Sequence, residues 1–349
     1  MTIHSWYYRA TLLAASTLMF ACGGGGSGGS SGTSSSMVSN TVGAGTTPPA
    51  AEAFDPVAAR KTGGLWRLVW SDEFDTATVD ALKWNYETNC AGGGNNELQC
   101  YTDAAQNAYI ANGQLHIDAI AEQATGFDGW NGLSGNVVTR DYSSARLTTQ
   151  NKGDWRYARV EVSAKVPFGQ GIWPAVWMMP TDSHYGQWPL SGEIDIMEAI
   201  NLDTGGAADN QVHQTLHFGN PWPNNQSVGH DLDPGFDVTA DFNNYAVEWQ
   251  EGEIRWYIND VLVANQNMDD WFTVGAASSA VSTTDARPFD QRFFLILNLA
   301  VGGNWPGAPD ASTLFPNTFS IDYVRVYQCA DNEDDGIGCA TLDGSPDYE

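Results

Sequence analysis

Alternating apolar and polar residues dominate the chain between residues 65 and 328. Several stretches alternate with period two or run apolar over the length of a strand, and turn residues separate them; they are residues 65–70, 114–121, 143–150, 158–166, 245–250, 254–260, 293–301 and 320–328. Asn112-Gly113 and Glu251-Gly252 lie between such stretches and are typical of tight hairpin turns. No long segment has helical periodicity, and no repeat of fixed length appears. The pattern predicts an all-β sandwich in one domain, residues 61–328.

One predicted strand breaks the alternation. In SGEIDIMEAI, residues 191–200, Glu193 and Asp195 alternate with isoleucines, but the next carboxylate arrives at Glu198 rather than at Met197. A β-bulge inserts one residue into a strand and changes the direction of the side chains that follow it. A bulge near Met197 therefore predicts that Glu193, Asp195 and Glu198 project from one face of the sheet. The alternative is an ordinary solvated strand face, on which acidic residues are common.

Carboxyl groups on one face suit glycoside hydrolysis, in which one carboxyl donates a proton to the leaving oxygen and another attacks or activates water. The charge of the central Asp195 would hold the neighbouring glutamate and keep the two protonation states apart. Surrounding residues favour a sugar cleft over a solvated face, because aromatic rings cover the flat apolar faces of sugars. Three tryptophans lie just upstream of these acids: Trp173, Trp177 and Trp188. Two polar residues, Arg146 and His217, lie on candidate strands of the same sheet.

Charge narrows the class of partner. The chain has 42 acidic and 15 basic residues and a net charge of −27, which excludes nucleic acid and anionic membrane surfaces as electrostatic partners. A neutral substrate suits this balance better. The 14 Trp, 13 Tyr and 14 Phe residues favour glycan binding only modestly, since aromatic rings also fill cores.

The N-terminus is typical of an exported protein. Residues 1–22 combine Arg9 with an apolar stretch of about twelve residues, which is the length of a signal peptide and too short to span a bilayer. The stretch ends at Cys22 in a sequence that resembles a bacterial lipoprotein cleavage box, with Met where Leu is usual; the alternative is an ordinary signal peptide cut near Ala21. Residues 23–60 are rich in Gly, Ser, Thr and Pro and predict a flexible tether. Lipidation would place the protein at the outer membrane or cell surface; without it the protein would be secreted.

The other cysteines form two pairs, each ten residues apart: Cys90 with Cys100, and Cys329 with Cys339. In an exported chain this spacing predicts two local disulfides, although other pairings stay open, and metal-ligand spacing is absent. Residues 329–349 are acidic and polar and predict a solvated tail held by the second disulfide.

The motifs also support a family resemblance. GEIDIMEAI resembles the bulged signature Glu-x-Asp-x-x-Glu of glycoside hydrolase family 16. NNELQ, YSSARLTTQ, GIWPAVWMMP, TLHFG and LNLAVGGNWPG are similar to the pattern of bacterial laminarinases, the endo-1,3-β-glucanases, and the likeness runs from LVWSDEFD to IDYVRVYQ, some three quarters of the chain. The resemblance implies a β-jelly-roll with a concave cleft, a β-glucan substrate and retention of anomeric configuration.

The same resemblance assigns roles to residues. Glu193 would be the nucleophile, Glu198 the acid/base and Asp195 the residue that assists them. Sugar platforms would be Trp173, Trp177 and Trp188, and hydrogen bonds to the glucan would come from Asn95, Arg146 and His217. Other interpretations stay open: core packing for Trp177, orientation of Glu193 by Arg146, and a turn role for Asn95. Relatives often carry an aromatic residue where this chain has Cys100, and a disulfide there would pin the loop that bears Asn95.

The resemblance further implies one structural Ca²⁺ on the convex face, with the oxygens of Glu73, the carbonyl of Gly113 and Asp322 as ligands. Glu73 and Asp322 would otherwise be ordinary polar residues at strand ends. No catalytic cofactor is implied, and a monomer is expected.

Two other functions compete with a β-1,3-glucanase. Agarases and carrageenases of the same fold share the bulged motif, but sulfated substrates favour basic residues and this chain has 15 in total. A non-catalytic glucan-binding protein would have lost the carboxylates, whereas Glu193 and Glu198 are both present. Mixed-linkage β-1,3-1,4-glucan remains a candidate second substrate.

Overall fold

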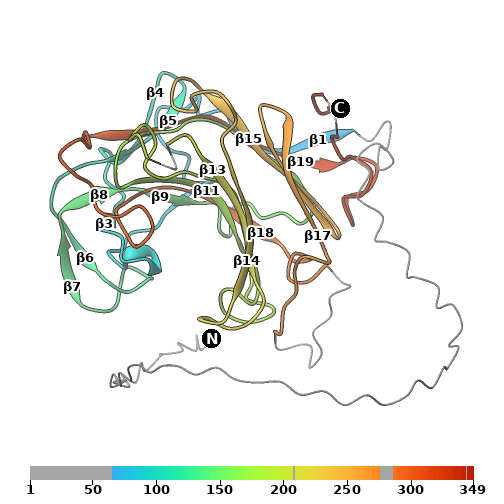
Figure 1. Ribbon diagram of the computed structural model, residues 1–349, viewed down its shortest axis with the longest axis horizontal. Helices are drawn as coiled ribbons and strands as arrows, with labels where there is room; N and C mark the ends of the chain where they lie inside the picture. The colour runs from blue at the N-terminus through green and yellow to red at the C-terminus, as the bar shows by residue number, and fades with distance from the viewer. Residues whose placement is uncertain (1–64, 207–208, 276–285, 343) are drawn as a thin grey trace, which may run out of the picture. The chain divides into compact units, whose positions relative to one another are not determined.

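Two large antiparallel β-sheets pack face to face in the computed structural model of the protein (Figure 1). The structure describes residues 65–206, 209–275, 286–342 and 344–349. The chain divides into two units after Ala53, and the described residues all belong to the second unit. The expected signal peptide, residues 1–22, and the expected linker, residues 23–60, lie outside the described residues. In the part of the chain that is described, no helix is long and apolar enough to cross a membrane.

The first sheet has eight strands in the order β17-β16-β15-β10-β19-β5-β4, with β1 paired to β19. Its strands are β1 (Trp66–Asp72), β4 (Ala108–Ala111), β5 (Gln114–Ala119), β10 (Arg159–Lys165), β15 (Asn243–Gln250), β16 (Glu253–Ile258), β17 (Val261–Asn267) and β19 (Asn317–Cys329).

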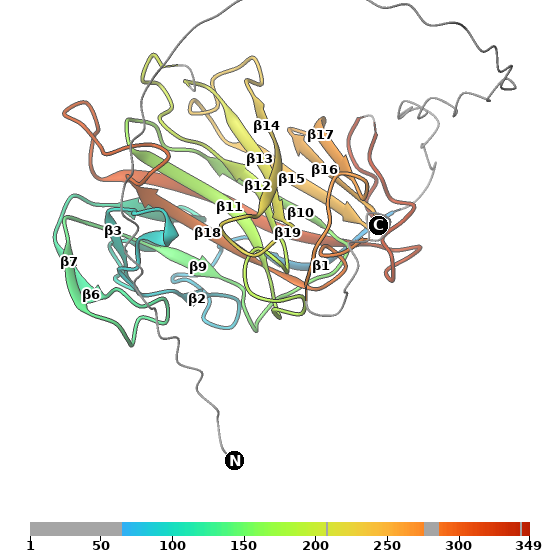
Figure 2. The ribbon, with the colours of Figure 1, turned by 60° about the horizontal axis from the view of Figure 1, so that its bottom comes forward.

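The second sheet has seven strands in the order β14-β13-β12-β11-β18-β9-β2. Its strands are β2 (Asn85–Tyr86), β9 (Arg146–Thr148), β11 (Ile172–Pro180), β12 (Glu193–Glu198), β13 (Val212–Phe218), β14 (Gln226–Leu232) and β18 (Phe293–Val301). Smaller elements flank it: the pair β3 (Gln99–Tyr101) and β8 (Tyr142–Ser144), the hairpin of β6 (Ala124–Phe127) and β7 (Val137–Arg140), and the 3-10 turn η1 (Gly92–Gly94). Figures 1 and 2 show this sheet curved, with its concave side turned away from the other sheet.

This arrangement is a β-jelly-roll, so the predicted fold class is confirmed. Both predicted hairpins form. Ala111 pairs with Gln114 across Asn112-Gly113, where both turn residues have positive φ, 55° and 74°, as a type I′ hairpin turn requires. Strands β15 and β16 are joined across Glu251-Gly252, where Gln250 pairs with Glu253, and of these two turn residues only Gly252 has positive φ, 79°.

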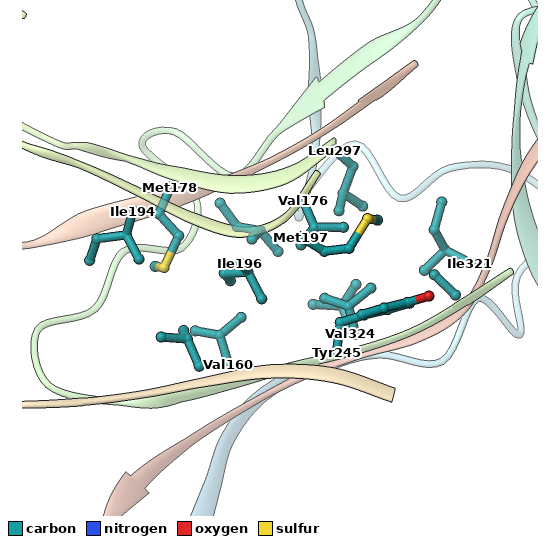
Figure 3. Close-up of a cluster of buried hydrophobic side chains, with 14 of the residues drawn as sticks. Val160, Val176, Met178, Ile194, Ile196, Met197, Tyr245, Leu297, Ile321 and Val324 are labelled. Atoms are coloured by element: carbon teal, nitrogen blue, oxygen red, sulfur yellow. The ribbon is translucent and has the colours of Figure 1, made fainter. Parts of the chain in front are cut away.

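The core lies between the two sheets. Side chains such as Val160 and Val324 from the eight-stranded sheet meet Val176 and Leu297 from the seven-stranded sheet, and all four are fully buried (Figure 3). Because inward positions alternate with outward ones along each strand, burying one face of β11 and β12 presents the other face on the concave side.

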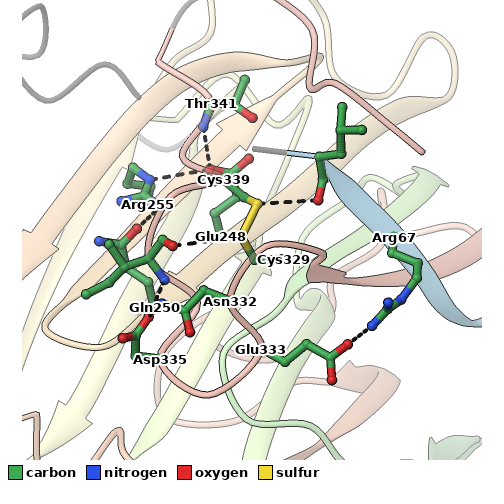
Figure 4. The surroundings of a disulfide bond; sticks show 12 residues. Arg67, Glu248, Gln250, Arg255, Cys329, Asn332, Glu333, Asp335, Cys339 and Thr341 are labelled. Atoms are coloured by element: carbon green, nitrogen blue, oxygen red, sulfur yellow. Dashed lines mark hydrogen bonds and ion pairs between the residues drawn. A yellow bond between two sulfur atoms is a disulfide. The ribbon is translucent and has the colours of Figure 1, made fainter. Parts of the chain in front are cut away.

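The C-terminal segment, residues 329–349, differs from its prediction. Both expected disulfides are present, Cys90–Cys100 and Cys329–Cys339, but the segment beyond Cys329 is not a solvated tail. The backbone N–H of Thr341 donates to the fully buried carboxylate of Glu248 at 2.9 Å (Figure 4).

The end of the chain is docked as well. The Tyr348 hydroxyl donates to Glu161 at 2.9 Å, and the Trp66 N–H donates to the carbonyl of Asp347 at 2.8 Å. The acidic composition predicted a solvated tail, and the side chains of Asp331, Glu333 and Asp334 do point outward. The prediction is wrong because backbone and hydroxyl groups of the same segment complete a buried polar network.

Candidate active site

The predicted bulge lies in β12. In the pairing with β11, the register moves from Met197 directly to Asp195, so Ile196 is the extra residue. The pairing with β13 breaks over the same interval, between Asp195 and Glu198. Ile196 and Met197 are consecutive, yet both point into the core (Figure 3). The bulge therefore brings Glu193, Asp195 and Glu198 to the concave face, as the sequence predicts.

Glu193 lies in a polar pocket at the start of β12, and its side chain is 13% exposed. Its Oε2 accepts a hydrogen bond from the indole N–H of Trp188 at 2.7 Å. The His217 Nε2 lies 3.7 Å from its Oε1, because Glu193 and His217 are register partners across β12 and β13. A cation and a donor therefore stabilise the ionised form of this carboxyl group.

Glu198 ends the same strand in a less polar setting. Its Oε1 accepts a hydrogen bond from the indole N–H of Trp173 at 2.9 Å, and Trp173 itself is only 9% exposed, packed with Ile200 and Ala300. Among the described residues, no Lys, Arg or His nitrogen lies within ion-pair distance of Glu198. This setting favours the protonated form.

Asp195 connects the two glutamates electrostatically. It is 2% exposed, and its Oδ2 lies 3.3 Å from the His217 Nε2. Its backbone is held from the opposite sheet, because the Trp256 indole donates to the Asp195 carbonyl at 2.9 Å. Asp195 is therefore a fixed buried charge beside two carboxyl groups.

The pKa values follow from this arrangement. Burial, with the charge of Asp195, raises the pKa of Glu193 to about 7, against the opposing effects of His217 and Trp188. Burial and Asp195 raise the pKa of Glu198 well above 4.5, and the Trp173 hydrogen bond opposes them. Burial lowers the pKa of His217, but its contact with Asp195 and the nearby acidic charges outweigh burial and raise it to about 10. The site can therefore hold one ionised and one protonated glutamate near neutral pH.

Trp177 and Arg146 form a second group on the concave face. Trp177 is half-buried, so it is not a core residue, and its indole donates to the Asn298 Oδ1 at 2.7 Å. The Arg146 guanidinium lies over the Trp177 ring, 4.6 Å from its centroid, and pairs with Glu87 at 3.1 Å. Arg146 thus contacts Trp177 and Glu87 rather than orienting Glu193 by a direct bond.

Asn95 follows the Gly-rich turn η1. Its side-chain amide donates to the Gly93 carbonyl at 3.3 Å, and its own carbonyl accepts from the Asn304 N–H at 2.7 Å. The residue therefore serves the turn, and it also lies against the loop that follows β18. The Cys90–Cys100 disulfide flanks this turn on both sides in the sequence.

Two further residues belong to the site although the sequence analysis did not single them out. His213 is the register partner of Glu198 and is 6% exposed; its Nδ1 lies 2.7 Å from Asp231, while its Nε2 is buried without a hydrogen-bond partner. The Trp305 ring packs edge-on against both His213 and Trp173, at 4.8 and 5.2 Å. The motif GGNWPG contained the signal for Trp305, whereas the position of His213 depends on strand register.

A cationic side chain lies among the acidic residues of β12. Ligand atoms of Glu193, Asp195 and His217 lie within 4.8 Å of one another, a set that could hold a metal ion in geometric terms. The raised pKa of His217 keeps this imidazole protonated at neutral pH, so it places a positive charge beside Glu193 and Asp195.

Glu73, one of the three residues expected to bind calcium, is engaged by an arginine in this arrangement. Both carboxylate oxygens of Glu73 accept hydrogen bonds from Arg325, at 3.0 and 2.8 Å. A carboxylate held by a guanidinium is not available to a cation without rearrangement. Asp322 lies on β19 next to the strand that follows the Gly113 turn.

Comparison with known proteins agrees with this geometry. A family model described as Glycosyl hydrolases family 16 matches residues 93–286. The chain is 41% identical over 273 residues to glucan endo-1,3-beta-glucosidase A1 of Niallia circulans, a match that covers 75% of this chain and 38% of that relative. It is 39% identical over 271 residues to glucan endo-1,3-beta-glucosidase of Cryptopygus antarcticus, covering 76% of this chain and 93% of that relative.

A solved structure is similar over the same region. The catalytic domain of an endo-1,3-beta-glucanase (laminarinase) from Thermotoga petrophila RKU-1 matches with a TM-score of 0.63 and 38% identity, covering 77% of this chain and 100% of that one. A family model over more than half of the chain, together with relatives near 40% identity, is decisive. The chain belongs to glycoside hydrolase family 16.

Proposed function

We propose that this protein is an endo-acting glycoside hydrolase that cleaves β-1,3-glucan with retention of anomeric configuration. The observation that carries the proposal is the bulged strand β12, which presents Glu193 and Glu198 in different electrostatic settings on one concave face. The names of the similar proteins support the choice of β-1,3-glucan, and the neutral substrate suits a chain of net charge −27.

In the first step, the ionised Glu193 attacks the anomeric carbon of the sugar. A bond forms between its carboxylate oxygen and that carbon while the glycosidic C–O bond breaks, and Glu198 gives its proton to the departing oxygen. The Trp188 indole and His217 hold the attacking carboxylate in place. The product is a glycosyl ester on Glu193, and Glu198 is now ionised.

In the second step, water replaces the leaving sugar. Glu198 takes a proton from the water as its oxygen attacks the anomeric carbon, and the ester bond to Glu193 breaks. Two inversions at the anomeric carbon give net retention. Asp195 supports both steps because its negative charge disfavours simultaneous ionisation of the glutamates.

A reducing-sugar assay across laminarin, lichenan, agarose and κ-carrageenan tests the substrate. We expect hydrolysis of laminarin, with lichenan as a weaker second substrate. Activity confined to agarose or κ-carrageenan would favour the agarase or carrageenase alternative, and binding without hydrolysis would favour a glucan-binding protein. NMR of fresh product should show the β-anomer first; the α-anomer would mean inversion and would refute a nucleophilic Glu193.

We also propose a structural Ca²⁺ on the convex face, held by Asp322, the carbonyl of Gly113 and a Glu73 released from Arg325. The ion would supply a hard cation for oxygen ligands and stabilise the fold. The melting temperature should rise with excess calcium and fall with EGTA. An unchanged melting temperature in both would exclude a stabilising site.

We propose that Cys22 is lipidated and anchors a monomeric enzyme to the bacterial outer membrane. The cleavage-box-like sequence and the Gly at position 23, rather than Asp, support this location. Wild-type protein should partition with membranes, and Cys22→Ala should release it. Recovery of wild type entirely in the soluble fraction would refute the anchor, and sedimentation of the released protein reports whether it is a monomer.

A further inference from the structure

The β6–β7 hairpin exposes an unusual number of large apolar side chains. Trp130 is 59% exposed, Leu133 83% and Val137 64%, and all three lie in or next to the loop that joins the two strands. Exposed apolar groups gathered on one element mark binding surfaces more often than isolated ones do. None of these residues takes part in the chemistry described above.

The hairpin is fixed to the chain around the first disulfide. The Cys90 N–H donates to the Phe127 carbonyl at 2.8 Å, and the Arg140 guanidinium donates to the Cys90 carbonyl at 3.2 Å. Gly132 has a φ of 64°, and a Cβ there would lie 1.8 Å from the Thr88 carbonyl oxygen, so only glycine permits this approach. The hairpin is therefore docked tightly rather than projecting freely.

The loop between the strands is also ordered by its own hydrogen bonds. The Asp128 carboxylate accepts from the Asn136 backbone N–H at 2.6 Å and from its side chain at 3.1 Å. The Gly129 N–H donates to the Ser134 carbonyl at 3.0 Å. A side chain held on such a loop loses little further freedom when it binds a ligand, which favours affinity.

The loop places Trp130 beside the η1 turn, from which further contacts lead toward Glu198. A Cβ on Gly94 would lie 3.7 Å from the Trp130 ring, and Gly94 directly precedes Asn95. Asn95 in turn contacts Asn304, and the next residue is Trp305, whose ring packs against the Trp173 that binds Glu198. In Figures 1 and 2 the β6–β7 hairpin lies at the margin of the molecule beyond β3. A row of contacts thus joins Trp130 to the catalytic residues.

We propose that Trp130 is a distal sugar-binding platform that extends the cleft beyond the η1 turn and binds glucan units remote from the bond that is cleaved. This inference rests on the proposed function. A broad, open indole face suits the apolar face of a pyranose ring. The strongly negative chain disfavours an anionic membrane as occupant, and continuity with the cleft favours the glucan over an unrelated protein.

The test measures kcat and KM on β-1,3-gluco-oligosaccharides of increasing length and on laminarin. Trp130→Ala should raise KM about 3- to 10-fold for laminarin and the longest oligosaccharides, the range expected for one aromatic contact. Both kcat and the KM of the shortest cleaved oligosaccharide should stay unchanged. Trp130→Phe should restore most of the affinity, and Leu82→Ala, which removes an 85% exposed side chain outside the hairpin, should behave as wild type.

Equal KM values for Trp130→Ala and wild type on every substrate would overturn the proposal, and so would equal losses on short and long substrates. If wild type did not hydrolyse laminarin, the proposed function would fail independently. Calorimetric titration of wild type and Trp130→Ala with laminarin would then test whether Trp130 binds glucan. Equal affinity of the two proteins, or no detectable affinity, would overturn the proposal. Concentration-dependent dimerisation of wild type that Trp130→Ala abolishes would assign the surface to a second copy of the chain instead.

Discussion

Trp173 donates its indole N–H to the Oε1 of Glu198 across 2.9 Å. The bond joins a residue at the start of β11 to the last residue of β12, and the Trp173 ring is itself packed edge-on by Trp305. Glu198, the proposed proton donor, is thereby held by a side chain that was expected only to stack on sugar. Trp188 holds Glu193 in the same way, at 2.7 Å.

Trp173→Phe removes this donor while keeping an aromatic ring. We expect kcat to fall about 10- to 100-fold, the value of one hydrogen bond to a charged group. The bond opposes the rise in the pKa of Glu198, so the alkaline limb of the pH–activity profile should move to higher pH. An unchanged kcat with only a raised KM would mean that Trp173 acts as a sugar platform alone.

Azide should separate the roles of the two glutamates. Glu193→Ala removes the proposed nucleophile and should abolish hydrolysis, and azide should restore turnover by attacking the open face to give an α-glycosyl azide. Glu198→Ala should spare substrates with good leaving groups, because these need no proton, and azide should give a β-adduct. Product anomers are read by NMR. Exchange of the two adducts between the variants would reverse the assignment.

Asp195→Asn should move the whole pH–activity profile to lower pH. In the proposed mechanism, activity needs Glu193 ionised and Glu198 protonated. Burial raises the pKa of both carboxyl groups, that of Glu193 to about 7, and the charge of Asp195 contributes to the rise. Without this charge both pKa values fall, so the acid limb and the alkaline limb shift in the same direction. His217 stays beside Glu193 and continues to favour its ionised form. A profile that narrows or shifts to higher pH would contradict the electrostatic role of Asp195.

The sequence predicted what depends on local pattern. The alternation of apolar and polar residues predicted the β-sandwich. The position of Glu198, one residue out of phase with Glu193 and Asp195, predicted the bulge, because an extra residue in a half-buried strand must be taken up by a local irregularity. The disulfides followed from two cysteine pairs of equal spacing in an exported chain. The roles of Asn95, Arg146 and His217 as sugar ligands came from resemblance, and they stay predictions.

The sequence did not predict features that depend on register or on long-range docking. His213 reaches the site because it faces Glu198 across β13, and no residue pattern encodes that register. The final segment is acidic, which indicates a solvated tail, but its docking depends on a buried acceptor at Glu248, more than 90 positions away. The sequence does not indicate a partner for Glu73, and only the fold shows that Arg325 donates hydrogen bonds to both of its carboxylate oxygens.

The buried charge network under the C-terminal segment should be sensitive to the loss of one partner. Arg159 is fully buried and contacts Glu248 and Glu161, each at 3.0 Å. Arg159→Leu leaves these carboxylates buried without their main cation and should lower the free energy of unfolding by about 3–5 kcal/mol. The control is Arg292→Ala, which breaks an exposed ion pair with Asp154 and should cost less than about 1 kcal/mol. Similar costs in denaturant titrations would contradict the importance of the network.

The two disulfides offer a matched comparison, because each closes a loop with a sequence separation of 10. The chain-entropy argument assigns both the same contribution, about 2.7 kcal/mol, so paired Cys→Ala variants should lose similar stability. Their effects on catalysis should differ. Cys90 and Cys100 flank the turn that bears Asn95 and support the β6–β7 hairpin, whereas Cys329 ends β19, in the sheet that carries none of the three acids. The Cys90/Cys100 variant should therefore raise KM for laminarin severalfold, and the Cys329/Cys339 variant should leave KM unchanged. Equal KM values in both variants would show that the first disulfide stabilises the fold without positioning the edge of the cleft.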